Sequence, residues 1–531
     1  MVILLALACN GPDEDIVELV EEPRMKGTDA LIRASLDLRG VRPSPEELQR
    51  IEADEGAYAE LVDEFLVDDR FGPRLRDLYS EVLLTRSEMW TISGEAYGID
   101  DTAAWEQSLG EETLMILSTV ATEDLPWTTV VTADWTMSNE LLAEAWPLDY
   151  PEGATGWQKT TYTDGRPHSG VLSTNSLWWR YTSTPSNANR KRANHISRMF
   201  LCNDYLVRPI DFDRNINLLD DEAVADALRN DPACVNCHQS LDPLAAYLFG
   251  FFHYNDENPL EMTEYHPERE LLYETYVGVE PAYFGSPGYT LDDLGHSIAG
   301  DNRFVECTVE TVYTGLLRRD ATLDDADALT FHREAFLEGD LVIRELFRSV
   351  VNDERYLAGA TDTEGYVPKK MATPDLLASQ VEGLTGFRWT YGGFDMMKTD
   401  RYGFRTLAGG ADGTSVTSSS TSPNTTLVLV QERLAQAGAW YAAETDAASE
   451  SPELFTEIDF SETPETGREA MVAQIQALHW AIYGERVEAD GDEVAANLAL
   501  WEELHTVDGD PVNAWAGLLS VLLRDPDLLF Y

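Results

Sequence analysis

The feature that most constrains this chain is C-V-N-C-H at residues 234–238, which places two thiols and an imidazole within five residues. On one helical turn, Cys234, Cys237 and His238 would share a face, because residues three and four apart are neighbours there. This spacing is the attachment motif for c-type haem, in which each thiol adds across a vinyl group and the histidine binds iron. With five Cys and nine His in 531 residues, chance would produce it in about one such chain in a thousand.

Two other uses of the motif stay open. Half of a zinc site has the same two cysteines, although a zinc ribbon needs a second ligand pair at similar spacing and the sequence offers none. A thioredoxin-like redox pair is usually set in a βαβ unit, whereas the surrounding pattern here is loop and helix. For haem, Pro243 is the residue whose carbonyl we expect to accept the Nδ1–H of His238 and fix its ring.

The second axial ligand of the iron has several candidates. We rank His168 first, because a loop could carry it across the haem, and Met262 second. Methionine ligation raises the reduction potential and bis-histidine ligation generally lowers it. An open site would instead favour peroxide or small-molecule chemistry. Further options are His195, Met199, His253, His266 and His296.

The charge of the chain is strongly one-sided. It has 95 acidic and 38 basic residues, a net charge of −57, so nucleic acid is excluded as a partner because phosphates would be repelled. A hydrophobic fraction of 44% is ample for a packed core, and there is no apolar run of about 18 residues that would cross a membrane. Against this background Arg190 and Arg192 form part of a basic cluster. They are expected either to hold the haem propionates or to pair with the chain's own acids.

The N-terminus resembles a lipoprotein signal peptide. An apolar run over residues 1–8 ends before Cys9, and the chain then turns polar and acidic. No basic residue precedes the run, and Ala6 stands where leucine is usual; a short buried N-terminal segment is the alternative. The pattern predicts lipidation of Cys9. It favours an outer-membrane lipoprotein, periplasmic or at the cell surface, held by its lipid anchor only.

Four segments together resemble the planctomycete/myxobacterial-type cytochrome c domain, whose pattern includes C-x-x-C-H-x-x-[IL]-D-P-L. They are Arg166–Leu172, Asn189–Asn194, Leu201-Cys202 and Cys234–Pro243. Residues 290–357 resemble its companion Cys-containing helical domain, and residues 33–71 another associated helical domain. The chain departs from the family after D-P-L, where it continues A-A-Y-L-F rather than G-F. The resemblance implies a secreted, mostly helical, haem-bearing protein and no particular reaction.

The fold expected from these patterns is mainly α, with several helical modules, a c-type haem-binding segment and irregular loop-rich regions. Apolar residues at helical spacing run through residues 28–90, where Ser44 is expected to cap a helix that begins at Pro45. The predicted segments are a signal (1–9), an acidic tether (10–27), an N-terminal helical module (28–90), a Trp-rich mixed region (91–165), the haem domain (166–289), a Cys307-containing module (290–361) and a C-terminal helical module with a Ser/Gly-rich loop (362–531).

A disulfide follows by elimination. If Cys9 carries lipid and Cys234 and Cys237 carry haem, Cys202 and Cys307 remain, and both lie in segments that resemble the family. Disulfides persist outside the cytoplasm, so we expect these two to pair and close a loop of about a hundred residues. The alternative is two buried free thiols.

The function predicted from the sequence is that of an envelope-anchored, c-type cytochrome-like lipoprotein. It would carry one haem and exchange electrons with a redox partner protein. An envelope structural or polymer-binding protein with a redox-silent haem is the alternative, and a haem peroxidase-like enzyme is a minor one. No Ser/His/Asp or paired-carboxylate motif stands out, so no catalytic residue is assigned.

Overall fold

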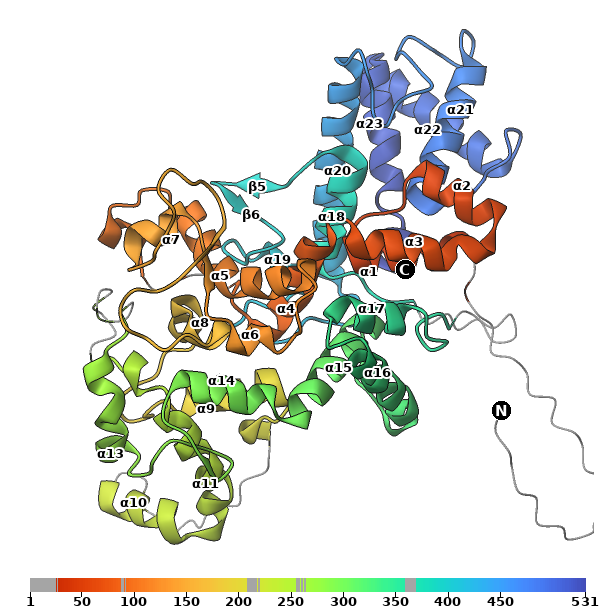
Figure 1. The fold of residues 1–531 in the computed structure, drawn as a ribbon. Helices are drawn as coiled ribbons and strands as arrows, with labels where there is room; N and C mark the ends of the chain where they lie inside the picture. Colours follow the sequence, from red (N-terminus) through yellow and green to blue (C-terminus); the bar gives the residue numbers. More distant parts are fainter. Residues whose placement is uncertain are drawn as a thin grey trace, which may run out of the picture.

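The computed structural model describes residues 25, 27–86, 90, 92–207, 217, 220–254, 258, 261, 264–358 and 369–531. The described chain is mainly helical, as expected (Figure 1). Its α-helices are α1 (Gly27–Arg39), α2 (Pro45–Ala53), α3 (Tyr58–Val67), α4 (Phe71–Leu83), α5 (Thr102–Thr122), α6 (Thr129–Thr132), α7 (Glu140–Ala145), α8 (Asn175–Arg180), α9 (Arg190–Leu201), α10 (Asp221–Asn230), α11 (Pro232–Ala246), α13 (Tyr273–Tyr276), α14 (Leu291–Ala299), α15 (Asn302–Leu317), α16 (Ala326–Glu338), α17 (Ile343–Val351), α18 (Pro374–Thr385), α19 (Phe404–Leu407), α20 (Thr425–Ala447), α21 (Arg468–Tyr483), α22 (Asp492–Asp508), α23 (Pro511–Leu522) and α24 (Pro526–Leu529).

The described strands are short and form antiparallel pairs. They are β1 (Thr136–Ser138) with β2 (Gln158–Thr160), β3 (Ala282–Tyr283) with β4 (Ser286–Pro287), and β5 (Thr390–Tyr391) with β6 (Phe394–Asp395). Single 3-10 turns connect several helices: η1 (Glu55–Ala57), η2 (Gly94–Tyr97), η3 (Gly170–Ser173), η4 (Tyr205–Val207), η5 (Phe249–Phe251), η6 (Pro267–Leu272) and η7 (Leu323–Asp325). None of the described helices is long and apolar enough to cross a bilayer.

The start of α2 confirms the predicted cap. Ser44 Oγ accepts the amide of Glu47 at 3.3 Å, and the Glu47 carboxylate accepts the Ser44 amide at 2.8 Å. Pro45 occupies the first helical position, where the missing N–H would have had no helical partner in any case. This reciprocal pair satisfies donors that the helix leaves free at its N-terminus.

Two large hydrophobic cores organise the described chain. The first takes buried side chains from α1, α3–α5, α9, α11, α14–α17 and the segments between them. The second is built from α18 and α20–α24. Helix α1 serves both, since Leu31 and Leu38 belong to the first core while Ile32 and Leu36 belong to the second. A helix that is apolar on opposite faces is expected to be buried all round, and α1 is buried from Ala30 to Arg39.

A buried polar cluster lies where these two cores meet. The carboxylate of Asp37 on α1 accepts the hydroxyls of Tyr356 at 2.6 Å and of Tyr531 at 2.8 Å. It also accepts the ammonium of Lys370. The backbones of Lys370 and Tyr531 pair with each other at 2.9 and 3.0 Å. These bonds hold Tyr531 against α1. They also satisfy the buried carboxylate of Asp37, whose burial without partners would be costly.

The Trp-rich region encloses a smaller cluster beside the first core. Its rings come from Trp90, Trp105, Trp146 and Trp179, with neighbouring centroids 6.1 to 6.4 Å apart. The Ser/Gly-rich loop of the C-terminal module lies between α19 and α20, over residues 408–424; its first part, residues 408–413, is buried, and a later part is bonded to the body of the protein. Ser419 Oγ donates to Glu81 of α4 at 2.6 Å.

Candidate haem-attachment site

Helix α11 places the C-x-x-C-H motif on one helical face. It begins at Pro232, and the N-cap carboxylate of Asp231 accepts the amide of Ala233 at 2.8 Å. Cys234, Cys237 and His238 follow in its first two turns, at the spacing that brings side chains together. All three are half-buried, so each remains reachable from solvent. In Figure 1, α11 lies at the opposite end of the molecule from α20–α23.

Both motif cysteines are free thiols. Cys237 packs against the first core. The pKa of the Cys234 thiol is raised, first by burial and then by the neighbouring Asp231 carboxylate and Cys237. A thioredoxin-like pair works through a thiol whose pKa is lowered, so this environment does not favour that alternative.

The Nδ1 partner of His238 is Asp242 rather than Pro243. Nδ1 lies 2.8 Å from Asp242 Oδ1, one turn further along α11. The expectation for Pro243 is corrected for a simple reason: α11 continues through this proline to Ala246. A helical carbonyl points along the axis, whereas side chains four residues apart share a face. Because an ionised carboxylate only accepts, a neutral His238 ring paired in this way has its proton on Nδ1 and its lone pair on Nε2.

Arg190 fixes the Asp242 carboxylate from the neighbouring helix α9. Its Nε donates to Oδ1 at 2.7 Å and its Nη2 to Oδ2 at 3.0 Å. Of the two expectations for Arg190, pairing with the chain's own acid is therefore the one observed. Although burial raises the pKa of Asp242, hydrogen bonds from His238 and Arg190 outweigh it and hold that pKa below its ordinary value.

Arg192 has a different environment from either one expected. Its buried guanidinium donates to the backbone carbonyls of Tyr181 at 2.9 Å, Trp178 at 3.0 Å and Phe251 at 2.9 Å. These bonds join α9 to α8 and η5, so Arg192 holds the surrounding segments together. Burial lowers its pKa to about 9.

Two residues, His168 and Met262, are the leading candidates for the second axial ligand of the iron. His168 is half-buried in the segment between β2 and η3. The next residue, Ser169, donates its hydroxyl to the carbonyl of Val131 in α6 at 2.8 Å, so this segment is anchored to α6. Met262 lies outside the described residues, as does the predicted lipidation site Cys9.

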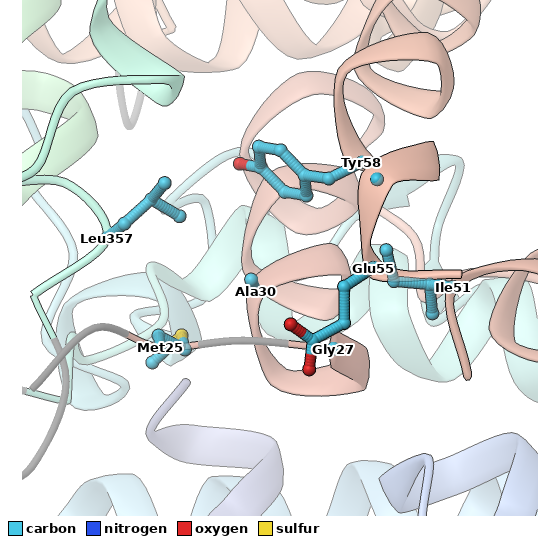
Figure 2. Close-up of a pocket in the computed structure, with 8 residues that line it drawn as sticks. Met25, Gly27, Ala30, Ile51, Glu55, Tyr58 and Leu357 are labelled. Atoms are coloured by element: carbon cyan, nitrogen blue, oxygen red, sulfur yellow. The ribbon is translucent and has the colours of Figure 1, made fainter. Parts of the chain in front are cut away.

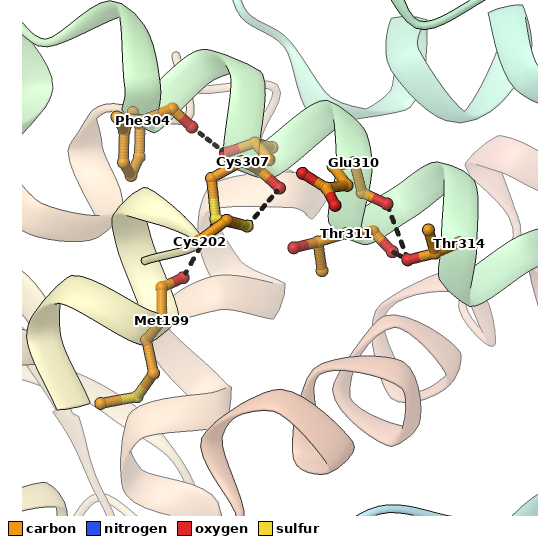
Figure 3. The surroundings of a disulfide bond; sticks show 8 residues. Met199, Cys202, Phe304, Cys307, Glu310, Thr311 and Thr314 are labelled. Atoms are coloured by element: carbon orange, nitrogen blue, oxygen red, sulfur yellow. Dashed lines mark hydrogen bonds between the residues drawn. A yellow bond between two sulfur atoms is a disulfide. The ribbon is translucent and has the colours of Figure 1, made fainter. Parts of the chain in front are cut away.

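The predicted disulfide is present between Cys202 and Cys307 (Figure 3). Cys202 follows the last residue of α9, and Cys307 lies in α15; their Cα atoms are 5.2 Å apart, within the range that a disulfide spans. The bridge therefore holds the C-terminal end of α9, the helix whose first residue is Arg190.

The described residues fit a covalently attached haem. No described group of three or more His, Cys, Asp or Glu side chains is arranged to hold a metal ion, but a haem iron receives four nitrogens from its porphyrin and needs only axial ligands from protein. Exposed apolar surface lies beside α11: Tyr205 of η4 bonds Ser240 at 2.7 Å, and the next two residues, Leu206 and Val207, are 74% and 78% exposed. For such a haem, His238 would supply the ligand nitrogen and the thiols of Cys234 and Cys237 the covalent links.

Sequence reasoning missed Asp242, although a signal was available. Asp242 stands four residues after His238, which on a helix is the spacing of a side-chain pair. The basic cluster in the sequence includes Arg190, but no local pattern identifies Asp242 as its partner, because Asp242 is 52 residues away in sequence.

A separate apolar hollow of about 270 Å³ lies between α1, α3 and Leu357 (Figure 2). Met25, Ile51, Tyr58 and Leu357 are among the residues that line it, together with Glu55. The hydroxyl of Tyr58 donates a hydrogen bond to the carbonyl of Val351 at 2.9 Å. The hollow contains no motif residue and has no part in the α11 site.

Comparison of the chain with protein-family models, with curated proteins and with solved structures finds no match.

Proposed function

We propose that this protein is a c-type cytochrome-like electron carrier with one haem, bound covalently through Cys234 and Cys237 and ligated by His238. The observation that carries the proposal is the chemical state of Cys234, Cys237 and His238, which share one face of α11. Two free thiols, of Cys234 and Cys237, share a helical face with an imidazole whose Nδ1 is held by Asp242. Metal-binding histidines characteristically donate their other ring N–H in this way, and the other described cysteines of the chain are joined to each other.

The residues of α11 would act as follows. Each thiol would add across one vinyl group of the haem, its sulfur bonding one vinyl carbon and its hydrogen passing to the other, so no oxidant would be consumed. His238 presents Nε2 to the iron while Asp242 prevents the ring from turning. Bound haem supplies one-electron exchange between ferric and ferrous iron. The first core, against which Cys237 packs, would cover one side of the site.

An envelope location is part of the proposal. The Cys202–Cys307 disulfide supports an oxidising compartment, because such bonds are rare where thiols are kept reduced. Lipidation of Cys9 would anchor the protein, and a redox partner protein would exchange electrons with the haem.

The test is production of the full chain in cells that have the haem-attachment machinery. We expect a haem-staining band on a denaturing gel and a reversible spectral change between oxidised and reduced protein. Cys234→Ala with Cys237→Ala should abolish the stain. Cys202→Ala with Cys307→Ala, which also removes two cysteines, should retain it.

Two results would count against the proposal. A colourless wild-type protein, or a stain that survives loss of both motif cysteines, would overturn haem attachment. Covalent haem that neither reduces nor reoxidises would overturn electron transfer and leave a structural role for the haem.

A further inference from the structure

We infer that Arg190 and Asp242 are positioning residues that set the electron-donating strength of His238, with opposite effects on the reduction potential of the iron. This inference rests on the proposed haem attachment and adds to it a mechanism for tuning the haem. It is drawn from three consecutive contacts between described side chains, which run from α9 to the imidazole.

The geometry links the three groups through one carboxylate. Oδ1 of Asp242 accepts both from His238 Nδ1 at 2.8 Å and from Arg190 Nε at 2.7 Å. Oδ2 accepts from Arg190 Nη2 at 3.0 Å. The side chains of Asp242 and Arg190 are only 10% and 16% exposed, so water competes little for these bonds. The fork of the guanidinium fixes the plane of the carboxylate, and the carboxylate fixes the ring.

The position of Arg190 is set by the packing of its helix. Arg190 is the first residue of α9, which packs against α11. Two residues further on, the buried Arg192 holds α9 to three backbone carbonyls. At the other end of the helix, Cys202 is bridged to α15. Because α9 is held near both ends, the position of Arg190 relative to α11 is fixed.

The two residues act on the imidazole in opposite directions. A carboxylate that accepts the Nδ1–H makes the ring a stronger donor through Nε2, which stabilises ferric iron and lowers the potential. Arg190 draws on the same oxygen lone pairs and so limits this donation. Removing the charge of Asp242 should therefore raise the potential, and removing Arg190 should lower it.

The experiment measures the potential of the haem-loaded full-length protein by spectroelectrochemical titration. Asp242→Asn keeps an acceptor for Nδ1 but removes its charge. At a fixed ambient potential it should increase the ferrous-to-ferric ratio by about tenfold, the lower end of the effect that loss of such a partner has on metal affinity or activity. A tenfold change is about 59 mV for a one-electron couple. Arg190→Gln should decrease that ratio. Arg190→Lys, which retains the charge but not the fork, should fall between Gln and wild type.

Matched controls separate this contact from a general charge effect. Arg198→Gln removes the same charge two turns further along α9, where Arg198 contacts Tyr181 and not Asp242. Asp226→Asn removes a carboxylate from α10, which packs on α11. Both controls should shift the potential by less than a third of the corresponding site variant. In the double variant, loss of Arg190 should have little further effect once Asp242 is neutral.

The outcomes distinguish the two levels of the argument. Wild-type protein without covalent haem would overturn the proposed function itself. If haem is attached but Asp242→Asn shifts the potential no more than Asp226→Asn does, the tuning role is refuted. Should Asp242→Asn fail to accumulate, the Arg190 variants decide: equal shifts in Arg190→Gln and Arg198→Gln would likewise refute it.

Discussion

Breaking the Cys202–Cys307 bridge should destabilise the first core by an amount that its loop length predicts. The cysteines are 105 residues apart in sequence. In the chain-entropy model, closing a loop of that length removes about 16 cal/mol/K from the unfolded state, or about 4.8 kcal/mol at 25 °C. That is a large share of the roughly 5–15 kcal/mol by which domains are stable. Since Cys307 is buried, its truncation to alanine adds about 1 kcal/mol of lost packing.

The assay is native-state hydrogen exchange with peptide resolution. It is best run in the Cys234→Ala, Cys237→Ala background, which removes haem from the comparison. We expect amides of α9 and α15 to lose protection by about 5 to 6 kcal/mol, or to become limited by the residual stability of the first core. Amides of α20 and α23, which pack on each other in the second core, should change much less.

Additivity provides the decisive comparison. Cys202→Ala, Cys307→Ala and the double variant each open the same loop, so their losses should agree to within about 1 kcal/mol. Two independent thiol contacts would instead give losses that sum in the double variant. Additive losses, or a double variant destabilised by less than about 2 kcal/mol, would refute the reasoning.

Two further predictions concern the ends of the chain. Burial lowers the pKa of Lys370 to about 7 against the opposing effect of Asp37, so between pH 7 and about 10 the unfolded state binds more protons than the folded state. The free energy of unfolding, measured by urea titration, should therefore rise with pH across this window. The rise should be absent in Lys370→Met, and a variant with the same slope as wild type would contradict the prediction. Separately, mass spectrometry of the mature N-terminus should find lipid on Cys9, and Cys9→Ser should release the protein from membranes; an unmodified Met1 would exclude the anchor.

The helical class and the local geometry of the motif could be predicted from short-range spacing. Ser44 and Pro45 start α2 because a cap and its helix are neighbours in sequence. Assignment of the other three cysteines predicts the Cys202–Cys307 pair, and this requires no knowledge of which helices meet. The carbonyl of Pro243 was the wrong acceptor for the Nδ1–H of His238, because α11 continues through this proline and brings the side chain of Asp242, four residues after His238, to the same face.

Spacing along one helix was enough to place Cys234, Cys237 and His238 on a common face, because three- and four-residue intervals return to the same side of a turn. What holds the imidazole depends on a contact between helices. Arg190 reaches Asp242 across 52 residues, and it does so only because α9 packs on α11 and is tied at its far end to α15. Such a contact depends on how the core packs as a whole, since each helix could pair its charges elsewhere in so acidic a chain.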